Sequence, residues 1–203
     1  LGRLFQTLTK WMLAVTFPLA IVMITHARPI MRIFGHEFEA GWPILIVGTC
    51  GQLVNCGVGS VGYLLLMSGN QRRLIRVQAV MAVVMVVLAV GLVPLWGALG
   101  AAVASALTNV GVNAWNLVEV RTALKLSPYN RSYLKLLPSV GSAVLVALLM
   151  RKASFFMGVD WAEVLAALVL AYVAFSLVTF AMGLDADDRL IANAIWTRVR
   201  GGF

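Results

Sequence analysis

The sequence predicts an all-α membrane protein, built as a bundle of about six transmembrane helices. Of its 203 residues, 61% are hydrophobic and 12% are charged, whereas a soluble domain is about half apolar and about one quarter charged. The apolar residues also lie in long blocks, several of which have the roughly 20 residues that a helix needs to cross a bilayer. A membrane β-barrel would instead show short segments of alternating apolar and polar residues.

The six expected spans follow one another with short connections, so no soluble domain fits between them. They are placed at residues 11–33, 43–67, 74–95, 97–120, 133–150 and 162–182, within one lobe, 1–183, that precedes a cytoplasmic tail, 184–203. Pro18 is expected to kink the first span and Pro29 to break its end, because proline lacks the amide that a helix interior needs. Pro43 suits the start of the second span, where that amide would have no helical partner.

The basic residues divide unequally between the two sets of alternating loops. Twelve of the 16 flank one side: Arg3, Lys10, Arg72, Arg73, Arg76, Arg121, Lys125, Arg131, Lys135, Arg189, Arg198 and Arg200. The other four are Arg28, Arg32, Arg151 and Lys152. The positive-inside rule assigns the larger set to the cytoplasm. Both termini are therefore expected in the cytoplasm, as an even number of spans requires.

The charged residues indicate neither an enzyme nor a nucleic-acid-binding protein. The net charge of +8 is explained by basic residues at helix ends, which set topology and contact anionic lipids. The eight acidic residues fall in loops, at span ends or in the tail, so we expect no catalytic residue. His26 and His36 have no neighbours at metal-ligand spacing, and we expect no metal or other cofactor. His26 is expected at the outer membrane interface and His36 in a loop.

Two stripes of uncharged polar residues run along the second and fourth spans. At 100° per residue, Gly48, Gln52, Asn55 and Gly59 fall within an arc of about 60°, and Ser105, Asn109, Asn113 and Asn116 within about 80°. Such residues often let helices pack closely and bond to each other. Alternatively, the stripes line one polar cavity that receives a solute. We retain both interpretations, with Gln52, Asn55, Ser105, Asn109, Asn113 and Asn116 as candidate cavity residues.

Two further features suggest more local roles. The segment from Gly97 to Ser105 has small residues four apart, a spacing typical of close helix packing within a bundle. Arg72, Arg73 and Arg76 form a short basic turn after Asn70. This turn sets topology, and it is also a candidate site for a lipid phosphate.

Three passages resemble a family of membrane transporters. They are FGHEF at 34–38 followed by Ala40 and Pro43, LLMSGN at 65–70, and LVPLWGALGAAVAS at 92–105. In this order they are similar to the C-terminal half of polysaccharide-biosynthesis flippases of the multidrug/oligosaccharidyl-lipid/polysaccharide exporter superfamily. The resemblance covers about residues 9–135, and the last two spans match only by length and position.

The resemblance implies one lobe of a two-lobe transporter, with a first lobe upstream of Leu1. It implies flipping of a polyprenyl-pyrophosphate-linked oligosaccharide across the inner membrane, with membrane lipids and polysaccharide polymerase machinery as further partners. None of the spans has a central Arg or Lys to match the family's pyrophosphate-binding residues. The alternatives are a multidrug or cation antiporter of the same superfamily, which commonly uses a buried carboxylate, and a membrane scaffold that transports nothing.

Overall fold

The computed structural model of the chain describes residues 2–125, 136–153 and 160–182. All regular secondary structure in these residues is helical. The elements are α1 (Gly2–Thr25), α2 (Ala27–Ile33), the 3₁₀ helix η1 (His36–Gly41), α3 (Trp42–Val58), α4 (Val61–Met67), α5 (Gln71–Trp96), α6 (Ala98–Leu124), α7 (Leu136–Ala153) and α8 (Asp160–Ala181). In the described residues, four segments are long and apolar enough to cross a membrane: Phe5–Thr25, His36–Val58, Gln71–Trp96 and Trp161–Ala181.

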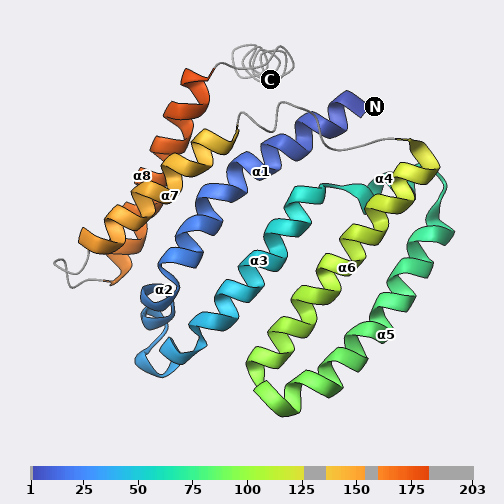
Figure 1. Ribbon diagram of the computed structural model, residues 1–203, viewed down its shortest axis with the longest axis horizontal. Coiled ribbons are helices and arrows are strands. Elements are labelled where there is room, and N and C mark those ends of the chain that lie inside the picture. The colour runs from blue at the N-terminus through green and yellow to red at the C-terminus, as the bar shows by residue number, and fades with distance from the viewer. Residues whose placement is uncertain (1, 126–135, 154–159, 183–203) are drawn as a thin grey trace, which may run out of the picture.

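The long helices form a row rather than a closed ring (Figure 1). The α7–α8 pair packs on α1, α1 packs on α3, α3 packs on α6, and α6 packs on α5 at the far edge. Successive long helices along the chain run in opposite directions, whereas α3 and α6, which are neighbours in the row, run in the same direction (Figure 1). The start of α1, the turn between α4 and α5, and the end of α8 therefore lie at the same end of the helices (Figure 1). We call this the terminal end, and the end that carries α2 and η1 the opposite end.

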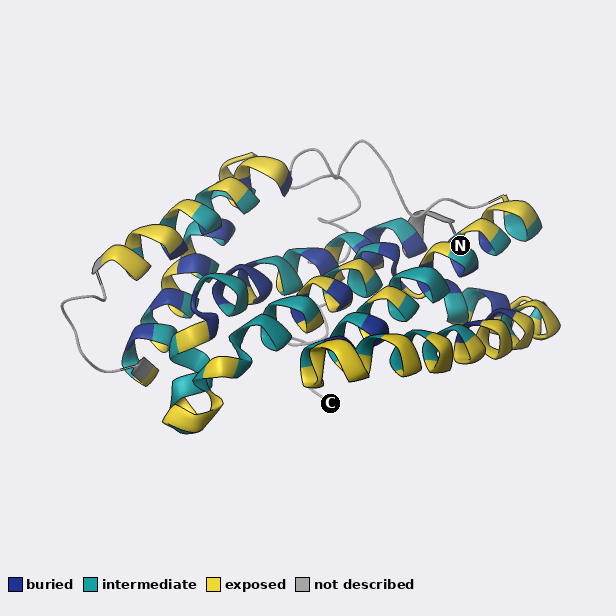
Figure 2. Cartoon of the chain, turned by 60° about the horizontal axis from the view of Figure 1, so that its bottom comes forward, coloured by how far each residue is buried: buried dark blue, intermediate teal, exposed yellow. Residues whose placement is uncertain are grey.

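Two apolar clusters hold the row together. One joins α1, α7 and α8 through residues such as Val22, Ala143 and Ala171, and the other joins α1, α4 and α6 through Phe5, Leu65 and Val120. Figure 2 shows buried residues on the facing sides of the helices and exposed ones on the outer sides. The outer helix α5 has only 6% of its most apolar segment buried, as expected for a face that contacts lipid rather than protein.

The first predicted span, 11–33, corresponds to a helix with different ends. The helix begins at Gly2 and stops at Thr25, and His26 separates it from the short α2. Pro29 lies in the first turn of α2, four residues after Thr25. Because proline has no amide to bond the carbonyl of Thr25 and its ring opposes that carbonyl, the end of α1 agrees with the expected break at Pro29. Pro18 does lie inside α1, fully buried.

The second predicted span is one continuous helix in the sequence interpretation, but two helices in the structure. Pro43 opens α3 as expected, and the helix ends at Val58. Gly59 then has φ 73° and ψ −161°, a conformation that is essentially restricted to glycine. Ser60 follows, and α4 begins at Val61. The prediction failed because Gly59 extends a small and polar stripe, which hides its role as a helix breaker.

The remaining spans correspond to helices with small shifts at their ends. The third and fourth are α5 and α6, joined through Gly97 at φ 55°. The fifth and sixth are α7 and α8, although residues 133–135 of the fifth and the whole predicted tail, 184–203, lie outside the described residues. The small-residue segment packs within the bundle as predicted: Gly100 lies against the backbone of Leu92, and Ala104 is fully buried.

Candidate functional site

A polar cavity lies beside the break between α3 and α4. Its volume is about 430 Å³, and residues of α1, α3, α4, α5 and α6 line it. The polar residues of the lining are Asn55, Ser60, Tyr63, Gln78, Asn109, Asn113 and Asn116. Tyr63, 70% exposed, belongs to the rim, whereas Asn113 and Asn116 are buried and form the floor.

The break in the helix gives the cavity part of its polar wall. At Gly59 the chain leaves α3, and the amide of Gly59 bonds back to the carbonyl of Asn55 at 3.3 Å. Gly59 and Ser60 both line the cavity. Backbone that departs from helical geometry within a membrane is found where protein or a water-filled cavity satisfies it.

The asparagines of α6 are only partly engaged with one another. Asn109 Nδ2 donates to the carbonyl of Gly51 in α3 at 3.4 Å. Asn113 Nδ2 donates to the backbone and side-chain oxygens of Asn109, at 2.9 and 2.8 Å. Asn116 is 2% exposed, and its Oδ1 has no hydrogen-bond partner among the described residues.

Both interpretations of the α6 stripe therefore have support, each at a different residue. Asn109 bonds across to α3, as in helix packing. Asn116 lines the cavity and keeps a buried side-chain oxygen without a partner among the described residues. A buried oxygen in this state costs free energy. The described lining contains carboxamide and hydroxyl groups and no charged side chain, so it suits a neutral ligand rich in hydroxyl or amide groups.

The structure brings four of the six predicted cavity residues together and separates two. Asn55, Asn109, Asn113 and Asn116 all line the cavity, whereas Ser105 is exposed and lies outside it. Gln52 is also exposed and lines a different hollow of about 360 Å³ between α1 and α3.

The separation of Gln52 and Ser105 from this cavity has a common cause. The arcs treated each helix separately, but Gly51 of α3 lies within contact distance of Ala106 of α6. This contact fixes which side of each stripe faces the neighbouring helix.

The sequence interpretation missed three polar residues of the lining. Gln78 belongs to α5, and Ser60 and Tyr63 belong to the break and to α4. Gln78 is the one amide within the apolar part of α5, and that isolation was a signal. Ser60 and Tyr63 gave no such signal, because their placement depends on the break.

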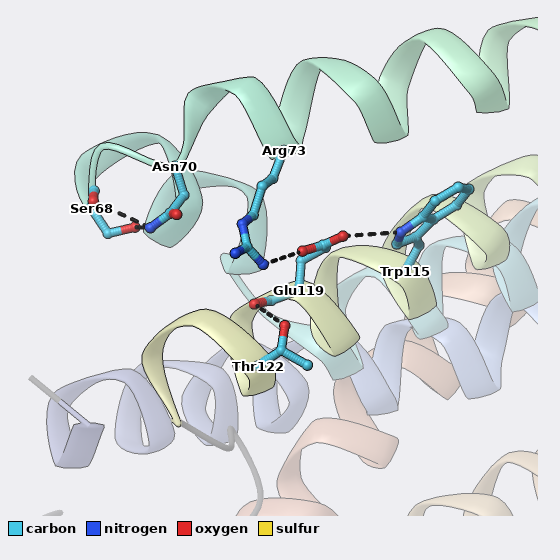
Figure 3. A network of polar contacts seen from close by, with 6 residues as sticks. All are labelled: Ser68, Asn70, Arg73, Trp115, Glu119 and Thr122. Atoms are coloured by element: carbon cyan, nitrogen blue, oxygen red, sulfur yellow. Dashed lines mark hydrogen bonds and ion pairs between the residues drawn. The ribbon is translucent and has the colours of Figure 1, made fainter.

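The basic turn is partly engaged by a carboxylate of α6 (Figure 3). Arg73 Nη1 donates to Glu119 Oε2 at 2.9 Å, and Trp115 Nε1 donates to Glu119 Oε1 at 3.3 Å. Arg72 and Arg76 are exposed at the same turn. Glu119 follows Asn116 by one helical turn, so this network lies beside the cavity toward the terminal end. Arg73, one of the three candidate phosphate ligands, therefore also links α5 to α6.

No protein-family model, curated protein or solved structure matches this chain.

Proposed function

We propose that the chain is one lobe of a transporter that flips a polyprenyl-pyrophosphate-linked oligosaccharide across a bacterial inner membrane. The observation that carries the proposal is the uncharged cavity beside the helix break, lined by the side-chain amides of Asn55, Asn109, Asn113 and Asn116. Broken helices that present backbone and amide groups to a cavity are a recurrent way to bind solutes in transporters. The ordered passages at 34–43, 65–70 and 92–105 favour the polysaccharide branch of the superfamily.

The proposal includes six crossings with both termini in the cytoplasm. The distribution of basic residues favours this arrangement, and so does the alternating direction of the long helices. The 27 residues of α6 extend about 40 Å, more than the roughly 30 Å of hydrocarbon. Its three asparagines reduce its apolar character, and all three line the cavity.

The chemistry of the cavity suits the sugar part of the substrate rather than its pyrophosphate. Carboxamides both donate and accept hydrogen bonds, so Asn113 and Asn116 suit sugar hydroxyls. No cationic side chain lines this cavity in the described residues. We therefore assign pyrophosphate binding to the upstream lobe that the family resemblance implies.

Flipping by the complete two-lobe protein tests the proposal. In proteoliposomes with a labelled polyprenyl-pyrophosphate sugar, Asn116→Leu is expected to slow flipping by about tenfold, which corresponds to the loss of about one buried hydrogen bond. Ser105→Leu is the matched control, because Ser105 is exposed on the same helix. Equal flipping by both variants at equal folded fraction would contradict the cavity assignment.

The same preparation distinguishes the alternatives. A multidrug or cation antiporter would move a cationic dye and leave the lipid-linked sugar in place. A scaffold for polysaccharide polymerase machinery would move neither. The polar cavity supports transport over the scaffold, for which a solid core of small residues would suffice.

Alternating access also requires a second body against which this lobe moves. We therefore expect the 203-residue chain alone to show no flipping above protein-free liposomes. Flipping by this chain at the rate of the two-lobe protein would overturn the two-lobe proposal.

A further inference from the structure

A second and chemically different pocket lies at the opposite end of the helices, where α2 and η1 are. Its volume is about 540 Å³, and it is bounded by the end of α1, by α2, η1 and the start of α3, and by the facing ends of α7 and α8. Its charged residues are Arg28, Arg32, Arg151, Glu39 and Glu163. It shares no lining residue with the asparagine cavity.

The three arginines come from distant parts of the chain. Arg28 and Arg32 lie one turn apart in α2, whereas Arg151 lies at the end of α7. Basic residues are rare on this side, since only Lys152 shares it. The fold thus gathers three of these four residues at one pocket. Basic residues that only set topology need not lie close together in space.

Aromatic and apolar groups shape the pocket around the charges. The guanidinium carbon of Arg28 lies 5.0 Å from the ring centroid of Trp42, a cation–π distance that holds the arginine in place. Ile24, Ile46 and Pro29 also line the pocket. The combination of guanidinium groups and apolar surface matches the boundary between lipid headgroups and acyl chains.

One of the two carboxylates lies close to a buried histidine behind the pocket. Glu163 is 6% exposed, and its Oε1 lies 3.6 Å from Nε2 of the fully buried His26. The other ring nitrogen of His26 lies 2.9 Å from the hydroxyl of Thr25, which itself donates to the carbonyl of Ile21 at 2.7 Å. His26 and Glu163 thus join the end of α1 to α8 beneath the pocket.

The pocket lining favours an anion. Its described charged side chains are three guanidinium groups and two carboxylates, an excess of positive charge. Arginine binds phosphate through paired hydrogen bonds in its planar fork. We infer that this pocket binds a phosphate group, such as the phosphodiester of an anionic lipid headgroup or a free phosphate.

Ligand-dependent thermal stability of the 203-residue chain in neutral detergent tests the inference. The probes are phosphatidylglycerol, phosphatidylcholine as the zwitterionic lipid, and inorganic phosphate. The double variant Arg28→Gln/Arg151→Gln is suitable, because both residues are exposed. The matched control is Arg121→Gln/Lys152→Gln, which removes the same charge from two exposed residues outside the pocket.

A pocket for phosphate predicts saturable stabilisation that the Arg28→Gln/Arg151→Gln variant weakens by about tenfold in apparent Kd, equivalent to about 1.4 kcal/mol. The control variant should keep the affinity of the unmodified chain. Stabilisation by phosphatidylglycerol alone identifies a lipid headgroup as the source, and stabilisation by inorganic phosphate identifies a soluble anion. The inference is overturned if no probe stabilises the chain, or if both double variants lose the effect equally. It does not depend on flipping, so it can fail while the proposed function stands.

Discussion

Gly59, at the break between α3 and α4, lies directly against the side chain of Thr9 in α1. A Cβ built on Gly59 would meet Thr9 Oγ1 and would lie 2.8 Å from Thr9 Cγ2. Thr9 is 1% exposed, and its hydroxyl is already donated to the carbonyl of Phe5 at 2.9 Å. The break forms part of the cavity wall. Its position is therefore fixed both by the backbone conformation of Gly59 and by the contact with Thr9.

Gly59→Ala is expected to destabilise the chain strongly. The positive φ costs about 1–3 kcal/mol for a residue with a Cβ, and the overlap with Thr9 adds an overpacking cost of about 1–3 kcal/mol. Thermal unfolding in detergent, followed by helical circular dichroism, measures the sum.

Gly69→Ala is the matched control, because Gly69 has φ 76° with no atom close to an added Cβ. It should show the backbone cost alone. An equal loss in the two variants would show that Thr9 makes no contribution.

The sequence predicts the long helices well because apolar length is a strong and local signal. It predicts the cavity less well because the two deciding features are not local. Asn55 and Asn116 meet only through the packing of α3 on α6, and the break at Gly59 reads in sequence as one more small residue. The pocket at the opposite end could not be predicted for the same reason, since Arg151 approaches α2 through the packing of α7 on α1 and of α8 on α1 and α2.

Gly100 provides a second test of close packing, at the contact between α5 and α6. An added Cβ would overlap the carbonyl group of Leu92, which is backbone and has little room to move. Gly100→Ala should therefore cost about 1–3 kcal/mol of stability.

The control for this variant is Gly91→Ala, in the exposed part of α5, where an added Cβ meets nothing within 4 Å. That change should leave stability unchanged or raise it by up to about 1 kcal/mol through helix propensity. A stable Gly100→Ala variant would contradict the close approach of the two helices.

The ion pair between Arg73 and Glu119 should be weak. The side chain of Arg73 is 43% exposed, so solvent screens the pair, and exposed pairs contribute about 0.2–1 kcal/mol. A double-mutant cycle with Arg73→Gln and Glu119→Gln should give a coupling energy in that range. It should fall further between low and high salt. A coupling above about 2 kcal/mol would indicate that this network is closed to solvent in the membrane.

The topology can be tested at two exposed residues that the structure places at opposite ends of the row. Phe38 lies in η1, and Arg72 lies at the start of α5. In a background with Cys50→Ala and Cys56→Ala, a membrane-impermeant thiol reagent added to intact cells should label Phe38→Cys. Arg72→Cys should react only after the cells are permeabilised.

This expectation follows from the unequal distribution of basic residues, which places the start of α5 in the cytoplasm. It also follows from the alternating directions of the helices, which put η1 at the other end (Figure 1). The reverse labelling pattern would invert the topology, and it would move the arginine pocket to the cytoplasmic leaflet. Labelling of both positions in intact cells would mean that the two ends face the same compartment, which six crossings do not allow.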